Sequence, residues 1–290
     1  MWQMALQKFR RFSVHIFLLV GLVVTLAPFA WMLSTSFKTS ESVFTYPPQW
    51  VPKSPTTENY QRLFGTESAE VAEKKGKMGF DFAVCTKNSI VISIAITILS
   101  LFVNALAAFA FAKLNFPGRE KIFALLLTTL MVPGQMTMIP VFLILKSLGL
   151  LNSYFGLIIP ALASAFGIFL IRQFMLTIPN DLIESARIDG CSDFRIFWSV
   201  ILPLCKPVLA ALGVFAFMGA WNNFLWPLIV MTKESKYTLP VALANLSGEY
   251  ATDYGLLMGG SLIVVAPMIL MFLFAQKFII GSFSTTGLKE

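Results

Sequence analysis

The chain has 290 residues, of which 57% are hydrophobic and only 13% are charged. This composition is too apolar and too poor in charge for an average soluble domain. The formal net charge is +7, but the basic residues gather in short segments between long uncharged ones. That distribution indicates membrane topology rather than nucleic-acid binding.

Long windows without Asp, Glu, Lys or Arg dominate the sequence, and each exceeds the roughly 20 residues that a helix needs to cross the hydrocarbon core. They are 14–37, 88–112, 122–145, 147–171, 207–232 and 254–276. Only helices and closed barrels satisfy the backbone in lipid, and barrel strands are about half this long. The sequence therefore predicts an all-α, polytopic membrane protein with six transmembrane helices.

Basic residues beside these windows predict the orientation. Lys8, Arg10 and Arg11 precede the first window and favour a cytoplasmic N-terminus. That apolar run is longer than the core of a cleaved signal peptide. With six spans, both termini are cytoplasmic. The predicted regions are a cytoplasmic N-terminus with the first span (1–37), an external loop (38–87), a five-helix core (88–280) and a cytoplasmic tail (281–290).

The predicted external segment 38–87 contains prolines at 47, 48, 52 and 55, which interrupt regular structure. A short helix is expected from Thr57 to Phe64. The external segment as a whole is expected to form a small subdomain with little hydrophobic core of its own. Two interpretations stay open, a solvated loop and a contact surface for an external binding protein.

The second and third spans carry the first polar residues expected at depth. Asn104, in the second span, is expected to bond a neighbouring helix rather than a substrate. In the third span, Ile122 to Leu145, Pro133-Gly134 and Pro140 are expected to kink or break the helix. Irregular backbone at that depth is tolerated where it is buried in protein or lines a cavity. Gln135 and Thr137 are therefore candidate pathway residues, unless the kink is purely structural.

A fourth span from about Tyr154 to Ile171 leads into a mixed polar and apolar stretch, residues 180–207. Asp181 and Glu184 have the spacing of a capping box. Gly190 suits a helix C-terminus, and Ser192 or Asp193 can cap a second helix. The stretch therefore predicts two short helices bent at a glycine beside the membrane, although an ordinary amphipathic surface loop has the same pattern.

The fifth predicted span, Val208 to Met231, contains Asn222 and Asn223 at depth. Two adjacent amides in hydrocarbon are costly unless they are bonded, so at least one is expected to face a translocation cavity. The last span, Gly255 to Phe278, is expected to be interrupted at Pro267.

Residues 184–203 resemble the EAA loop of ABC importer permeases, whose motif reads Glu-Ala-Ala, three residues, Gly, nine residues, Ile-x-Leu-Pro. Glu184, Ala186, Gly190 and Leu202-Pro203 keep this spacing, while Ser185 replaces the first alanine, at the second position of the motif, and Val200 replaces the isoleucine. Residues 186–190 and the Trp-Asn-Asn-Phe run at 221–224 look like the carbohydrate-uptake, maltose-permease-like branch. The resemblance extends over most of the chain and implies the type I ABC importer permease fold.

The resemblance implies a transport subunit of the bacterial inner membrane that forms half of a pathway for a sugar or oligosaccharide. Its loop at 180–203 would couple to a cytoplasmic ATPase through Leu182, Ile183, Glu184, Ser185, Ala186, Asp189, Gly190 and Pro203. The implied partners are a second homologous permease, two ATP-binding subunits, an external solute-binding protein and membrane lipid. This chain would bind no cofactor, and ATP and Mg would lie at the ATPase subunits.

The sequence lacks the common catalytic motifs, which favours a transport subunit over an enzyme. The sequence contains no Gly-x-x-x-x-Gly-Lys-Ser/Thr loop, one histidine, His15, and no carboxylate inside a predicted span. The three cysteines have no metal-ligand spacing. The alternatives are a permease for another solute, such as a glycerophosphate-type compound, and a carrier that works without ATP.

Overall fold

The computed structural model describes residues 2–68, 80–249 and 253–284, and every regular element within them is a helix. Two compact units make up the chain. The first contains Met1–Phe82 and Leu243–Ala266, and the second contains Ala83–Ala242 and Pro267–Glu290.

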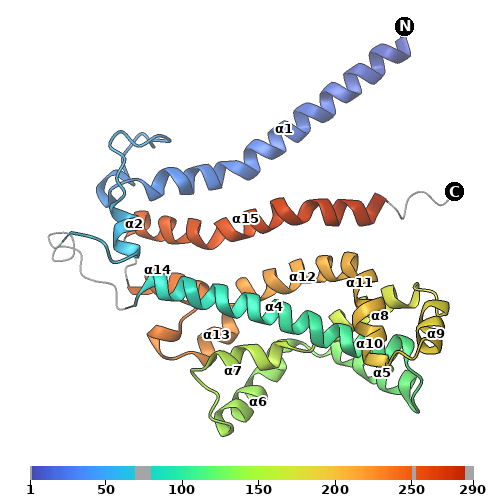
Figure 1. Ribbon diagram of the computed structural model, residues 1–290. Coiled ribbons are helices and arrows are strands. Elements are labelled where there is room, and N and C mark those ends of the chain that lie inside the picture. The colour runs from blue at the N-terminus through green and yellow to red at the C-terminus, as the bar shows by residue number, and fades with distance from the viewer. Residues whose placement is uncertain (1, 69–79, 250–252, 285–290) are drawn as a thin grey trace. The chain divides into compact units, whose positions relative to one another are not determined.

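Three helices are long and apolar enough to cross a membrane: α1 (Trp2–Ser36), α4 (Phe82–Lys113) and α15 (Tyr254–Ser284) (Figure 1). Three helix pairs pass the same test together but are bent at a short break, which brings the candidate spans to as many as six. The helical class and the multispan architecture predicted from the sequence are thus confirmed. α15 continues through Pro267, so the interruption expected there is wrong.

In the first unit, a short helix anchors the segment that follows α1. α2 (Glu58–Leu63) lies where the sequence predicted a helix. Its buried Asn59 donates to the carbonyl oxygens of Ser36 and Lys38 at 2.8 and 2.9 Å. Arg62 pairs with Asp253, just before α15. Carbonyl oxygens at the C-terminal end of α1, which have no partner within the helix, are therefore satisfied by a side chain of α2.

Lys38, directly after α1, is buried in the same unit. Its Nζ donates to the carbonyl oxygen of Gln49 at 2.6 Å and lies 4.1 Å from the centroid of the Trp31 ring. Burial lowers the pKa of Lys38 because the charged ammonium loses water.

The second unit is built on α4 and a series of shorter helices. They are α5 (Arg119–Thr128), η2 (Thr129–Met131), α6 (Gly134–Ser147), α7 (Tyr154–Ile158), η3 (Ile159–Ala161), α8 (Ala165–Leu176), α9 (Asp181–Ile188), α10 (Asp193–Ile196), η4 (Phe197–Ile201), α11 (Leu202–Leu204), α12 (Lys206–Trp221), α13 (Leu225–Val230) and η5 (Glu234–Lys236). η1 (Ser40–Ser42) belongs to the first unit, and α14 (Leu239–Glu249) crosses the boundary between the two.

The third predicted span breaks where the sequence indicated. Residues Arg119–Met131 and Gly134–Ser147 meet at 104°, and Pro133 between them has an extended ψ of 130°. Proline cannot donate a hydrogen bond to the preceding turn, which explains the break. Pro140, in contrast, is accommodated inside α6.

The fourth and fifth predicted spans are less regular than expected. Tyr154–Ala161 and Ala165–Leu176 meet at 43°. α12 ends at Trp221, and α13 begins only at Leu225. The prediction of one helix over 208–231 is therefore wrong. The two asparagines at this break do not share a helix, so their directions do not follow from helical periodicity.

Candidate coupling loop and membrane cavity

The segment between α8 and α12 forms a two-helix loop bent at a glycine. At the end of α9, Gly190 N donates to Arg187 O and Cys191 N donates to Ala186 O, both at 3.0 Å. This pair of bonds is the Schellman pattern, and Gly190 has the left-handed φ of 78° that it requires. The predicted bend at Gly190 is confirmed.

The start of α9 differs from the prediction. Asn180 is the N-cap and makes no side-chain capping bond, so Asp181 and Glu184 do not form the predicted capping box. α9 begins one residue earlier than predicted, so Asp181 is its first helical residue rather than its N-cap. Asn180 Oδ1 makes no cap bond and instead accepts from Nζ of Lys113, the last residue of α4, at 2.8 Å. Ser192 caps α10 as predicted, with Oγ accepting from a backbone N–H at 3.4 Å.

One face of the loop is anchored in the core of the second unit. Ile183 on α9 is only 4% exposed, and Ala186 is partly buried beside it. Ile196, Phe197 and Ile201 are fully buried and pack with residues of α4 and α8. The Phe197 and Phe109 ring centroids lie 5.4 Å apart. This packing ties the loop to the membrane helices.

The opposite face is exposed and partly apolar. Ile188 is 86% exposed, Phe194 is 60% exposed and Leu182 is 42% exposed. The remaining predicted coupling residues are also exposed, namely Glu184, Ser185, Asp189, Gly190 and Pro203. Large apolar side chains beside carboxylates on a short protruding loop are typical of a protein contact surface.

An ion pair links the two short helices of the loop. Arg187 Nη2 lies 2.9 Å from Asp193 Oδ1, and both side chains are about half exposed. Such a pair contributes little to stability, on the order of 0–1 kcal/mol. Its geometric effect is to hold the start of α10 against the end of α9.

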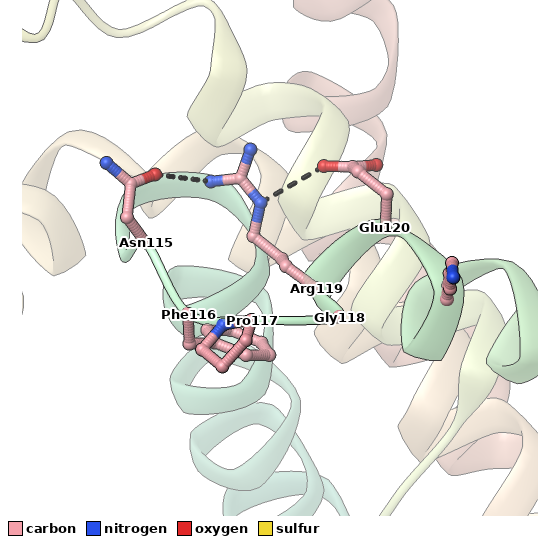
Figure 2. Close-up of a pocket in the computed structure, with 7 residues that line it drawn as sticks. Asn115, Phe116, Pro117, Gly118, Arg119 and Glu120 are labelled. Carbon is pink, nitrogen blue, oxygen red and sulfur yellow. Dashed lines mark hydrogen bonds and ion pairs between the residues drawn. The ribbon is translucent and has the colours of Figure 1, made fainter.

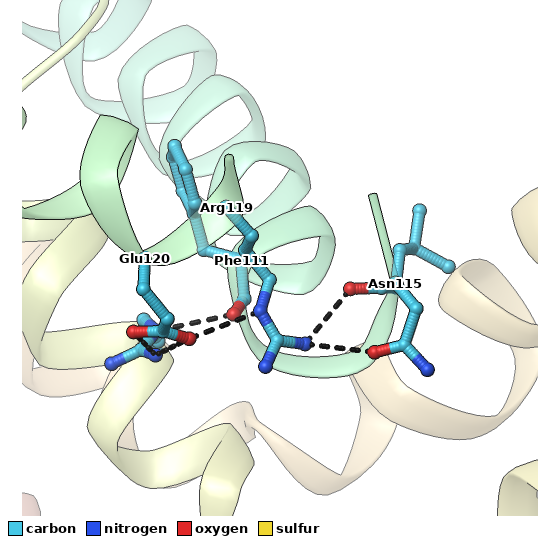
Figure 3. Close-up of polar contacts among 6 residues, drawn as sticks. Phe111, Asn115, Arg119 and Glu120 are labelled. Carbon is cyan, nitrogen blue, oxygen red and sulfur yellow. Dashed lines mark hydrogen bonds and ion pairs between the residues drawn. The ribbon is translucent and has the colours of Figure 1, made fainter. Parts of the chain in front are cut away.

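Polar contacts fasten α4, α5 and α8 together at the same end of the unit (Figure 3). Arg172 of α8 is buried, and its Nη2 donates to both carboxylate oxygens of Glu120 at 3.1 Å. Its Nε donates to Phe111 O at 3.1 Å, and its guanidinium carbon lies 4.0 Å from the Phe123 ring centroid. Arg119 reinforces the turn by donating to Leu114 O at 2.9 Å.

A shallow pocket of about 590 Å³ lies on this turn, lined by residues 115–121 (Figure 2). Arg119 is held there by Glu120 at 3.0 Å and by Asn115 at 3.2 Å. Because its guanidinium already has these acceptors, the pocket offers no free cation from Arg119 and is best described as part of the turn.

A second cavity of about 260 Å³ lies among the membrane helices and contains one predicted pathway residue, Asn223. Its polar lining comes from α4, from the break before α8 and from the break after α12, and the rest of its lining is apolar. The lining residues are Ile96, Ser100, Asn104, Ala161, Ser164, Phe166, Leu212, Phe215, Ala216, Gly219, Ala220 and Asn223. No charged residue lines it among the described part of the chain. The cavity therefore offers amide and hydroxyl groups in a largely apolar setting.

The other pathway candidates lie elsewhere. Gln135 and Thr137 are exposed near the start of α6, and Thr137 Oγ1 donates to Gly134 O at 2.9 Å. Asn222 is exposed, and its amide contacts Met268 Sδ at 3.8 Å. The structure thus brings Asn223 to the cavity and does not bring the other three there.

Asn104 was expected to bond a neighbouring helix, and this is confirmed. Its Oδ1 accepts from Ser164 N, the N-cap of α8, at 2.9 Å. Gly167 packs so closely that an added Cβ would lie 2.8 Å from Asn104 Nδ2. The sequence analysis missed Ser164, Gly167 and the Arg172–Glu120 pair. Their positions depend on contacts 50 or more residues apart, which local patterns do not reveal.

Metal-ligating side chains do not cluster in the described ranges, where no group of three His, Cys, Asp or Glu residues could hold an ion. The loop offers exposed apolar and acidic groups, and the cavity offers neutral polar groups.

Comparisons with known proteins agree with this picture. Residues 104–279 match the family described as binding-protein-dependent transport system inner membrane component. The chain is 40% identical over 202 residues to the arabinooligosaccharides transport system permease protein AraQ of Bacillus subtilis, covering 70% of this chain and 72% of that protein. It is 32% identical to the sn-glycerol-3-phosphate transport system permease protein UgpE of Pectobacterium atrosepticum, covering 92% and 93%.

Among solved structures, the fold resembles a chain from the crystal structure of a bacterial ABC transporter involved in the import of the acidic polysaccharide alginate. The TM-score is 0.77 at 24% identity, covering 92% of this chain and 96% of that one. At this identity the likeness shows the shared fold.

Proposed function

Because the chain belongs to the family of binding-protein-dependent transport system inner membrane components, we propose that it imports a sugar or oligosaccharide and is driven through the α9–α10 loop. The observation that carries the proposal is the two-sided loop. One face is locked into the core by Ile183, while the other presents Leu182 and Ile188 to a partner.

The coupling mechanism follows from this arrangement. A cytoplasmic ATPase subunit receives the exposed face, with Leu182, Ile188 and Phe194 filling apolar pockets and Glu184 pairing with a basic group. Gly190 sets the angle between the two helices. Because Ile196 and Phe197 are buried among α4 and α8, a displacement of the loop is passed to the membrane helices as a rigid-body movement.

The assembly requires further chains. This chain binds no ATP or Mg in our proposal, and both belong to two partner ATPase subunits. A second permease of similar fold supplies the other half of the pathway, and a binding protein delivers the solute outside. With the N-terminus in the cytoplasm, as Lys8, Arg10 and Arg11 favour, the α9–α10 loop faces the same compartment.

The cavity supports a neutral, hydroxyl-rich solute. Ser164 and Asn223 offer hydrogen-bonding groups, and among the described residues no cation lines the cavity to pair with a phosphate. The likeness to AraQ points to an oligosaccharide. The likeness to UgpE over nearly the whole chain favours a second candidate, a glycerophosphate-type solute, which would need basic groups from the partner permease.

Reconstituted vesicles containing the full transporter and its binding protein test the coupling proposal. Gly190→Val strains a left-handed position, whereas Gly190→Asn is the matched control because asparagine tolerates that conformation. We expect uptake to collapse in the valine variant and to survive in the asparagine variant, with both proteins present in the membrane. Normal uptake by Gly190→Val, or uptake by vesicles without ATP, would contradict the proposal.

The solute is tested by comparing the uptake of two candidates in the same vesicles. Arabinotriose and glycerol 3-phosphate are supplied separately, each with the cognate binding protein. Uptake of the sugar supports the first candidate, and uptake of the phosphate alone supports the second.

A further inference from the structure

The first unit contains an aromatic pocket that the coupling mechanism does not use. Its volume is about 520 Å³, within the range of small-ligand sites, and it lies beside the end of α1 and the start of α15. Trp31, Phe44, Tyr46 and Tyr254 all line it, together with Thr35, Val43, Thr45, Pro48 and Met258.

The aromatic rings are arranged as open faces rather than as a closed core. Tyr46 is 96% exposed and Phe44 is also well exposed. The Phe44 and Tyr254 ring centroids lie 5.1 Å apart with the planes at 90°. Trp31 is held in place from behind by Trp50, at 5.2 Å between centroids, and by the ammonium of Lys38. The pocket therefore has a fixed wall and an accessible rim.

Thr35 adds a polar group that has no partner. It lines the pocket, its side chain is only 2% exposed, and its Oγ1 forms no hydrogen bond with any described residue. A buried hydroxyl left unpaired costs free energy, so such a group in a native structure calls for an explanation. A ligand hydroxyl in the pocket would supply the missing partner.

These features select one class of ligand. A sugar ring has an apolar C–H face that stacks on aromatic rings and a rim of hydroxyls that hydrogen-bond. A lipid acyl chain would leave Thr35 unpaired, and an ionic ligand would find no charged side chain among the residues that line the pocket. We propose that this pocket is a saccharide subsite, formed by Trp31, Phe44, Tyr46 and Tyr254 around the Thr35 hydroxyl.

The inference rests on the proposed function, since it assumes a sugar-importing transporter with a cytoplasmic N-terminus. In that orientation the Trp31 end of α1 lies at the outer side of the membrane. The pocket then meets sugar on the side where the binding protein releases it.

The test measures equilibrium binding of radiolabelled arabinotriose to the full transporter in nanodiscs, without the binding protein. Phe44→Ala removes an exposed ring and should weaken binding about tenfold. Thr35→Val keeps the shape and removes the hydroxyl, so it should weaken binding by about five- to tenfold. The same valine should leave thermal stability without sugar unchanged or raised, because the unpaired hydroxyl is gone.

Phe155→Ala is the matched control, since Phe155 is an exposed aromatic residue at the start of α7 that does not line the pocket. It should bind the sugar like the wild type. Equal affinities for wild type, Phe44→Ala and Thr35→Val would overturn the inference, as would an absence of binding to the wild type. An effect of Phe44→Ala on binding-protein affinity alone would also overturn it and would identify a protein contact.

Uptake driven by the binding protein is measured in parallel to separate the two proposals. If arabinotriose is transported and the pocket variants bind it normally, the subsite fails and the proposed function stands. If no sugar is transported while glycerol 3-phosphate is, the proposed solute fails, and binding of arabinotriose in nanodiscs decides the subsite separately.

Discussion

The α9–α10 loop and the break between α12 and α13 show two different ways of ending one helix and starting the next. In the loop, a left-handed glycine and Ser192 at the next N-cap fix the geometry through local backbone bonds. At the α12–α13 break, contacts between residues far apart in the sequence fix the geometry. One of them is the hydrogen bond that Trp226 Nε1 donates to Gly156 O at 3.2 Å. The loop presents apolar side chains outward, whereas the break brings Asn223 to a cavity among the helices. Local control suits the proposed contact surface, and long-range control suits the proposed pathway.

The largest expected effect separates the two faces of α9. Ile183→Asp places an unpaired carboxylate in the core, so we expect a loss of more than about 4 kcal/mol and little protein in the membrane. Ile188→Asp lies on the exposed face and should leave the protein folded while uptake falls about 30-fold or more. Membrane yield, thermal unfolding and vesicle uptake measure these outcomes. Normal uptake by Ile188→Asp would show that this face makes no essential contact.

A pair of glycines tests the contrast between long-range and local control. A Cβ at Gly156 would lie 2.5 Å from Leu150 O and 3.1 Å from Val230 Cγ1, so Gly156→Ala should cost roughly 3 kcal/mol by overpacking. At Gly190 nothing lies within 4 Å, and Gly190→Ala should cost only about 1 kcal/mol of backbone strain. Thermal unfolding of the two alanine variants gives the ranking. The reverse order would refute the contrast.

Two asparagines, the buried Asn104 and the exposed Asn222, differ in the same sense. Asn104→Leu leaves Ser164 N without its acceptor at the start of α8, which should cost about 2 kcal/mol. Asn222→Leu, its exposed counterpart, gives up only a weak contact with sulfur and should change stability by less than about 0.5 kcal/mol. Chemical unfolding in detergent compares the pair, and equal losses would show that the Asn104 bond does not hold the break.

The smallest effect concerns the caps of the loop. Ser192→Ala removes the capping oxygen of α10 and should cost about 1 kcal/mol. Asp181→Asn should cost less, about 0.3 kcal/mol, since only its favourable position in the first turn of α9 is lost. If the Asp181 variant proved the more damaging of the two in thermal unfolding, the capping-box prediction would have to be revived.

The sequence predicted well what short-range physics controls. Six uncharged windows located the apolar segments, Pro133 located a break, and Gly190 located the bend of the loop. The sequence failed where contacts between distant residues accompany a helix boundary. Asn180, whose Oδ1 accepts from Lys113 Nζ, is the N-cap of α9 in place of Asp181, so the capping box at Asp181 does not form. The end of α12 at Trp221 likewise depends on packing of α13 against α7, which no local pattern contains.

Site residues followed the same rule. The proposed coupling residues lie in one continuous segment, so a single motif was enough to select them. The cavity joins Asn104, Ser164 and Asn223 from three segments, and only Asn223 was selected for it, on the cost of burying an amide. Gln135 and Thr137 were selected for their place beside a predicted helix break, and they lie at an exposed helix start, because a break in a helix exposes side chains as readily as it buries them.

The central claim is that the α9–α10 loop contacts a nucleotide-hydrolysing subunit, and site-specific photocrosslinking tests it most directly. A benzophenone amino acid replaces Ile188 in the assembled transporter, with Phe155 as the matched position on α7. We predict a crosslink from position 188 to the ATPase subunit and none from position 155. A crosslink from position 188 to the external binding protein, or no crosslink to the ATPase subunit in an assembled and active transporter, would contradict the account.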